Sequence, residues 1–190
     1  MNIAAFDLGT HCGYCFNAAI GGANFQIGTY HLATAKEVTK LREERLDRRC
    51  DPRVVNFFKL VCGVLAKDID AIVFEDVQFG TYTFQTQLWS SYRTALQIAS
   101  LSAQRLKTIE CVPVGTLKKF ASSGSASKQD MCQAALSRFP SMFPGYRQAK
   151  NGLYNEEKKI TLDDNAVDAF WIWAWAQQNL AKVDLDKLGK

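Results

Sequence analysis

The first 16 residues constrain the fold most, because they place a carboxylate at the end of a core strand. Residues Ile3 to Phe6 form an apolar run that predicts a buried strand, and Asp7 follows it directly. Gly9 permits a tight turn, and the segment ending at Phe16 predicts the returning strand of a hairpin. A charge at this place is costly to bury unless it is paired or holds a metal ion. Asp7 is therefore either a turn cap or a functional carboxylate at an open end of the sheet.

Length and composition favour one α/β domain spanning 1–190, because 190 residues with 47% hydrophobic content are ample for one such domain and short for two. A net charge of +4 is compatible with nucleic-acid binding without demonstrating it. The Cys12-x-x-Cys15 spacing has no second pair to match it, which disfavours a zinc site. Asp7 interrupts the only N-terminal apolar run, so we expect no signal peptide, reduced thiols and a cytoplasmic location. The apolar run 170–176 is too short to span a bilayer, so we expect no membrane partner.

The first half of the chain predicts three strands followed by a helical region. The third strand is expected at Phe25–Leu32, and a capping box of Thr34 and Glu37 predicts a helix start. Asp51-Pro52 predicts a second start, with Asp as the N-cap. A core-facing stripe is then expected at Val54, Val55, Phe58, Val61, Cys62 and Leu65.

The second half predicts two more strands and the remaining helices. The expected strands are 70–77, which ends near Glu75, and 108–114. The expected helices are 85–106, 116–121, a capped helix from Ser127 to 139, and 161–180, while 140–159 is expected to be irregular. The order βββ-α-β-α-β-α-α predicts one mixed five-stranded sheet with helices on both faces.

Several carboxylates are expected to meet at one edge of this sheet. Asp7 and Glu75 both end apolar strands, which converge if those strands are parallel neighbours. Asp164 and Asp168 share a helix face, as do Asn165 and Asp168. Such a cluster is tolerable when Mg²⁺ or Mn²⁺ neutralises it, and two ions about 4 Å apart suit phosphodiester displacement. The alternative is that Asp164 completes a capping box with Thr161, although Asp168 then lies unexplained in an apolar helix.

Four motifs in this order resemble the RuvC-type Holliday-junction resolvases, which have the RNase H-like fold. They are Phe6–Thr10, Phe74–Val77, Gly124–Lys128 and Asp164–Ala169. The resemblance implies a metal-dependent, structure-selective endonuclease that resolves four-way junctions and other branched DNA by paired phosphodiester hydrolysis. The longer 140–159 stretch suggests a divergent branch, such as a phage-encoded one.

The resemblance implies a site with two Mg²⁺ ions, for which Mn²⁺ would substitute. Its catalytic residues would be Asp7, Glu75, Asp164 and Asp168, all of them metal ligands. The family usually has an acid or histidine where this chain has Asn165. Either Asp164 replaces that ligand, which we favour, or Asn165 ligates through its amide oxygen.

The resemblance also implies how DNA and a second subunit bind. Phe79 stands where the family carries an aromatic that wedges into the junction. Lys118, Lys119 and Lys128 surround a Gly/Ser loop and are expected to contact phosphates. The 88–103 face of the long helix, with Ala95, Ala99 and Ala103, is expected to pair two subunits in a homodimer; the alternative is that it packs on its own sheet.

Two other functions remain open at this point. Asp7-Leu-Gly-Thr10 also resembles the phosphate loop of actin-like phosphotransferases, which need two such domains. The second alternative is a DNA-binding relative that has lost catalysis because its site is degraded. Asn165, at a position where the family usually has an acid or histidine, is compatible with this alternative.

Overall fold

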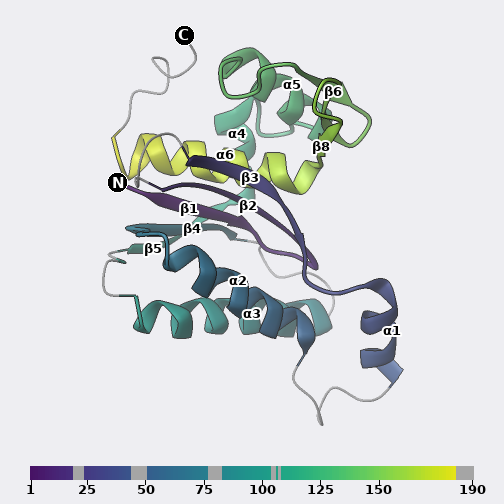
Figure 1. The fold of residues 1–190 in the computed structure, drawn as a ribbon, viewed down its shortest axis with the longest axis vertical. Coiled ribbons are helices and arrows are strands. Elements are labelled where there is room, and N and C mark those ends of the chain that lie inside the picture. Colours follow the sequence, from purple (N-terminus) through teal and green to yellow (C-terminus); the bar gives the residue numbers. More distant parts are fainter. Residues whose placement is uncertain (19–23, 44–50, 77–82, 104–105, 107, 183–190) are drawn as a thin grey trace.

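A five-stranded sheet forms the centre of the computed structural model, which describes residues 1–18, 24–43, 51–76, 83–103, 106 and 108–182 (Figure 1). The strand order is β3-β2-β1-β4-β5. The strands are β1 (Ile3–Asp7), β2 (His11–Ala18), β3 (Asn24–His31), β4 (Ala71–Asp76) and β5 (Thr108–Pro113). The first three are antiparallel, while β4 runs parallel to both β1 and β5. The mixed sheet expected from the sequence is therefore confirmed.

Helices cover both faces of this sheet (Figure 1). One layer holds α2 (Pro52–Leu65) and α3 (Thr83–Leu101), and the other holds α4 (Val114–Ala121), α5 (Lys128–Arg138) and α6 (Asp164–Asn179). The short α1 (Ala35–Glu43) lies beyond one end of the sheet. In the described part of the chain, no helix has the length and apolar character needed to cross a bilayer.

Side chains along each strand point alternately to the two faces of the sheet, and so contribute to two separate hydrophobic cores. Ala5 faces α6, whereas Ala4 and Phe6 face α2 and α3. The same alternation separates Cys12, which is buried on the α2–α3 side, from Cys15, which is buried on the α6 side. This C-x-x-C pair therefore cannot form one metal site, in agreement with the expectation from its spacing.

A second, three-stranded sheet occupies part of the 140–159 stretch that was expected to be irregular, together with the first residues of the helix expected at 161–180. Its antiparallel strands are β6 (Tyr146–Ala149), β7 (Gly152–Asn155) and β8 (Ile160–Leu162). They contain 4, 4 and 3 residues, which is too few for an alternation pattern to stand out. Gly152, with a φ of 123°, opens β7 in a conformation that favours glycine. The expectation of irregular structure between Pro140 and Lys159 was therefore wrong.

Local capping signals located three of four helix starts. Thr34 and Glu37 form the expected capping box, and Asp51 caps α2. Ser127 also forms the expected box at the start of α5. The box expected from Thr161 and Asp164 is wrong, because Thr161 lies in β8 and Asp163 is the N-cap of α6.

The buried face of α2 is rotated from the expected stripe. Phe57, Val61 and Val64 are buried, whereas Phe58 is 36% exposed. Phe57 and Phe58 are both apolar, and helical spacing alone did not decide which of them faces the sheet. The assignment of Phe58 to the core was therefore wrong.

The face of α3 that was expected to pair two subunits is covered within the chain. Tyr92, Ala95 and Ala99 are all buried against α2 and the sheet. Tyr92 also donates a hydrogen bond from its hydroxyl to the Gly9 carbonyl at 3.2 Å. The alternative that this face packs on its own sheet is correct, and the expectation that it joins two subunits was wrong.

Helix α6 rests on β2 at a point where no side chain intervenes. A Cβ atom added to Gly13 would lie 2.0 Å from the Asn165 carbonyl oxygen and 3.2 Å from Ala169 Cβ. Farther along β2, Asn17 Oδ1 accepts hydrogen bonds of 3.1 Å from both Trp173 and Gln177. Gly13 is also the residue paired with Asp7. The close contact therefore brings the first turns of α6 beside Asp7.

We expect Gly13→Ala to destabilise the protein, because the added methyl must push α6 away from β2. Overpacking of this kind costs about 1–3 kcal/mol. Gly63→Ala is the matched control, since a Cβ at that helical position meets nothing within 4 Å and alanine favours a helix by about 1 kcal/mol. Thermal unfolding should show a lower Tm for the first variant and an unchanged or higher Tm for the second. A Tm for Gly13→Ala equal to that of the wild type would contradict this packing.

Candidate active site

Three carboxylates line one cavity of about 350 Å³ at the carboxyl ends of two central strands. Asp7 ends β1 and Glu75 lies near the end of β4. The two strands are parallel neighbours, with Phe6 paired to Phe74, so the next residue on each strand is one of these acids. Asp168 enters the same cavity from α6. The structure thus brings together three of the acids expected to meet.

The N-cap of α6 is fixed from two sides, and this places the other acids. Asp163 accepts a hydrogen bond from the Ala166 amide at 3.0 Å and another from the Thr29 hydroxyl on β3. Asn165 follows and lines the cavity, donating to Asp163 through its amide at 3.3 Å. Asp164 lies beside the cavity, where it forms an ion pair with Lys128.

This arrangement bears on the choice between Asp164 and Asn165. The asparagine shares the cavity lining with Asp168, whereas Asp164 is engaged by a lysine. The assignment of Asp164 as the further ligand stays a prediction, and it requires Lys128 to release that carboxylate.

Burial and mutual repulsion perturb the two strand carboxyls. Burial is the largest cause that raises the pKa of Asp7 well above its usual range, and the charges of Asp168 and Glu75 raise it further. Burial likewise raises the pKa of Glu75 to about 7, again with a contribution from Asp168. Both residues therefore hold protons more tightly than an exposed acid does.

The acid on α6 shows the same behaviour, moderated by nearby lysines. Burial raises the pKa of Asp168 to about 6, while Lys128 lowers it and Asp164 raises it. For Lys128, burial lowers the pKa, but its hydrogen bond to Asp164 and the surrounding acids outweigh burial and leave the pKa raised. The cavity is therefore acidic at its centre, with cationic side chains at its edge.

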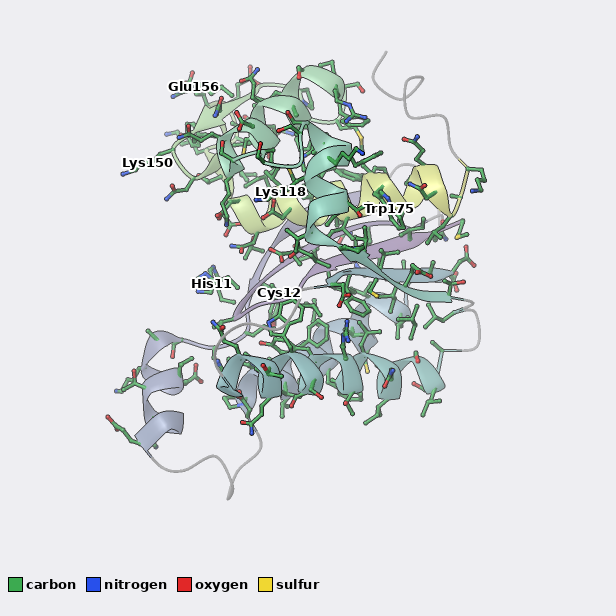
Figure 2. All side chains as sticks on the ribbon, turned by 180° about the vertical axis from the view of Figure 1, so that it is seen from behind. His11, Cys12, Lys118, Lys150, Glu156 and Trp175 are labelled. Atoms are coloured by element: carbon green, nitrogen blue, oxygen red, sulfur yellow. The ribbon has the colours of Figure 1, made fainter. Side chains whose placement is uncertain are left out.

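Only some of the residues expected to contact DNA line the acidic cavity. Lys118 on α4 and Lys128 at the start of α5 line the cavity, while Lys119 is exposed outside it. Figure 2 shows Lys118 in the layer that also contains α6. Phe79 lies outside the described residues. The apolar walls of the cavity are Val114, Leu117, Ala126 and Met131.

The donor set suits a hard cation, although its side chains do not converge on one point. Carboxylate and amide oxygens are the ligands that Mg²⁺ and Mn²⁺ prefer. Within the described residues, no three His, Cys, Asp or Glu side chains lie close enough together to ligate a single ion as they stand. The carboxyls that repel one another in this cavity need either protons or cations for neutralisation. The site therefore fits a divalent metal by its chemistry, and binding requires its side chains to turn inward.

Two positioning features were missed in the sequence. Gly13 permits the contact with α6, and its only signal was a glycine between apolar residues of a predicted strand. Asp76, next to Glu75, forms an ion pair with Arg93 on α3 instead of entering the cavity. The side chains of the adjacent acids Glu75 and Asp76 thus lie on opposite faces of the sheet.

Sequence comparison alone places this chain in no group, since no protein-family model and no curated protein matches it. Solved structures do match. Thermus thermophilus RuvC aligns over 94% of this chain and 96% of its own, with 16% identity and a TM-score of 0.59. The same protein in complex with a Holliday-junction substrate aligns over 90% of each chain, with 18% identity and a TM-score of 0.60.

A eukaryotic structure is similar over a smaller share of its length. The yeast mitochondrial Holliday junction resolvase Ydc2 aligns over 90% of this chain and 75% of its own, with 12% identity and a TM-score of 0.52. These identities are low, so the likeness concerns architecture. The chain has the RNase H-like fold in the form seen in RuvC-type Holliday-junction resolvases.

Proposed function

We propose that the protein is a metal-dependent, structure-selective endonuclease that hydrolyses phosphodiester bonds in branched DNA, with four-way junctions as its substrate. The observation that carries the proposal is the shared cavity of Asp7, Glu75 and Asp168. Similar folds support it, because one of the similar proteins was solved with a Holliday-junction substrate. The cytoplasmic location expected from the sequence stays a prediction.

Two bound Mg²⁺ or Mn²⁺ ions would activate the attacking water and stabilise the leaving oxygen. Asp7, Glu75 and Asp168 would hold these ions, with Asp164 or Asn165 completing the set. Lys118 and Lys128 would hold the phosphate that faces the acids, since both line the cavity. Lys119, which is exposed beside Lys118 on α4, would contact a neighbouring phosphate.

We expect Asp7→Asn to abolish cutting of four-way junctions in Mg²⁺ while binding is kept, because the amide removes a central negative charge without changing the shape of the site. Asp76→Asn is the matched control: its carboxylate lies close in sequence but pairs with Arg93 outside the cavity. Cleavage and gel-shift assays on the same junction measure both effects.

The same assays, together with an ATP hydrolysis assay, separate the competing functions. Unchanged cutting by Asp7→Asn would contradict the proposed site. If the wild type binds junctions but cuts none of them with Mg²⁺, the protein is a non-catalytic DNA-binding relative. ATP hydrolysis with no junction binding would favour the phosphotransferase.

The pH dependence of stability follows from the raised pKa values. A carboxyl that titrates higher in the folded state stabilises the fold at low pH, and this contribution is lost as the pH rises through the folded pKa. Glu75, with a pKa of about 7, and Asp168, with a pKa of about 6, therefore destabilise the metal-free fold as solutions become neutral. In EDTA we expect the Tm to fall between about pH 5 and about pH 8.

Glu75→Gln should flatten that fall and weaken the rise in Tm that Mg²⁺ causes near pH 8. Glu110→Gln on β5 is the control, because this glutamate is exposed and does not line the cavity. Thermal scans with EDTA and with Mg²⁺ give both quantities. Equal pH slopes for the wild type and Glu75→Gln would contradict the shared cavity.

We further propose a homodimer, because a four-way junction has two-fold symmetry and its resolution needs two cuts. A two-fold dimer supplies two identical sites through one self-complementary surface. With the inner face of α3 buried, the groove between α2 and α3 is the surface that we assign to the dimer. The groove has a volume of about 420 Å³ and is lined only by uncharged residues: Val54, Val55, Phe58, Ser90, Ser91, Thr94, Ala95 and Ile98.

Exposed apolar side chains at this groove identify the residue to change. Ile98 is 54% exposed and Leu101, one turn farther along α3, is 88% exposed. We expect Ile98→Arg to convert a dimer into monomers in sedimentation and to uncouple the two nicks on a junction. Ile160→Arg is the control, since Ile160 is 45% exposed on β8 and lies outside the groove.

Ala99→Arg would be a poor test of the dimer, because Ala99 is buried in the core of its own chain. A wild type that stays monomeric at micromolar concentration, both alone and on junction DNA, would contradict the dimer.

A further inference from the structure

A second cavity, of about 490 Å³, lies on the other side of the loop that follows Asp7. Gly9, Thr10 and His11 form one wall, and Ala33 with residues of α1, α2 and α3 forms the others. Its volume lies within the range of about 300–1,000 Å³ that is usual for ligand pockets. Figure 2 shows His11 at the end of the sheet near α1, away from the layer that holds Lys118. The acidic cavity and this one therefore share the loop after β1 as a partition.

The polar lining suits a flat, uncharged ligand better than a phosphate. Arg53 lines the cavity and is 3% exposed, but Asp51 neutralises it. The guanidinium donates to the two Asp51 carboxylate oxygens at 3.0 Å from Nε and at 2.6 Å from Nη2. An anion entering here would meet a charge that is already paired, so electrostatic attraction for it is small.

The remaining lining offers the indole of Trp89 and several uncharged hydrogen-bonding groups. Trp89 and Gln85 lie four residues apart on α3, and so face the cavity from the same side of that helix. Thr10 and Thr39 contribute hydroxyl groups. An indole stacks on any nucleobase, while amide and hydroxyl groups both donate to and accept from a base edge.

The position of the cavity links it to the acidic site. Gly9 is two residues from Asp7, so their Cα atoms lie within about 7 Å of one another. The Tyr92 hydroxyl holds the Gly9 carbonyl at 3.2 Å, which fixes the partition between the two cavities. A nucleotide whose phosphate lies in the acidic cavity, or its neighbour in the strand, can thus present its base to this second cavity.

We propose that the cavity between α1, α3 and the loop 9–11 is a binding pocket for one unpaired nucleobase of the DNA strand that is cut. This inference rests on the proposed endonuclease function and deepens it. A base paired in a duplex cannot enter such a pocket, so the pocket selects a strand that is single-stranded or unstacked near the cut. Branch points supply such bases.

The test uses four-way junctions that carry one abasic nucleotide, moved through successive positions around the cut. Binding to the full-length protein is measured in EDTA by fluorescence anisotropy, and cutting is measured separately with Mg²⁺. At one or two positions, loss of the base should weaken binding by the wild type about tenfold, equivalent to about 1.4 kcal/mol. Trp89→Ala should bind intact and abasic junctions equally, whereas Trp89→Phe should restore the difference.

Two further variants guard against a folding defect. Thr39→Trp fills the cavity from an exposed position of α1 and should also remove the dependence on the base. Tyr30→Ala removes an aromatic side chain that is 47% exposed on β3 and outside the cavity lining, so it should keep the wild-type difference.

The outcomes separate the pocket from the endonuclease. If removing a base changes junction affinity equally in the wild type, Trp89→Ala and Thr39→Trp at every position, the pocket is overturned, even when cutting is normal. Base-dependent binding through Trp89 with no cutting in Mg²⁺ supports the pocket and overturns the endonuclease. No binding of any junction by the wild type overturns both.

Discussion

The contact between the start of α6 and β2 at Gly13 is the constraint on which the rest of the structure depends. The helix reaches the strand backbone because Gly13 has no side chain, and Gly13 lies directly opposite Asp7 in the sheet. Hydrogen bonds at Asp163 and Asn17 then fix the helix along its length. Two segments more than 150 residues apart are thereby held so that Asp168 and Asp7 line one cavity. The acidic site is a product of backbone packing as much as of the acids themselves.

Holding these acids together has an energetic cost that the described structure only partly offsets. Each carboxyl is at least half-buried, and the charge of Asp168 raises the pKa of both Asp7 and Glu75. Lys128 lowers the pKa of Asp168, but it also forms an ion pair with Asp164. Carboxyls of this kind keep their protons, or exchange them for cations, more readily than exposed acids do. The negative charge at this end of the sheet therefore needs protons or bound cations to neutralise it.

Sequence patterns predicted the elements that carry long periodic or apolar signals, and failed where neighbouring residues were equivalent. Asp7 and Glu75 were found because each ends an apolar strand, and the mixed sheet followed from the order of elements. The cap of α6 was misplaced by two residues, because Thr161 and Asp164 match a capping-box pattern, whereas Thr161 lies in β8 and Asp163 is the cap. The roles of Phe57 and Phe58 were confused because these neighbouring side chains are identical. The packed face of α3 also has the small residues typical of a helix pair, and only the tertiary structure shows which surface covers it.

The small sheet adds a constraint on how the length of this chain can vary. Gly152 begins β7 with its α-carbon against the joint between β8 and α6, where a Cβ would lie 2.0 Å from the Leu162 carbonyl oxygen. Residues inserted in the turn between β6 and β7 would only lengthen an exposed connection. An insertion between β8 and Asp163 would instead displace the cap of α6 and carry Asp168 out of the cavity. The chain can therefore gain residues in the exposed connection at 150–151, while the joint at 162–163 is bound to a fixed length.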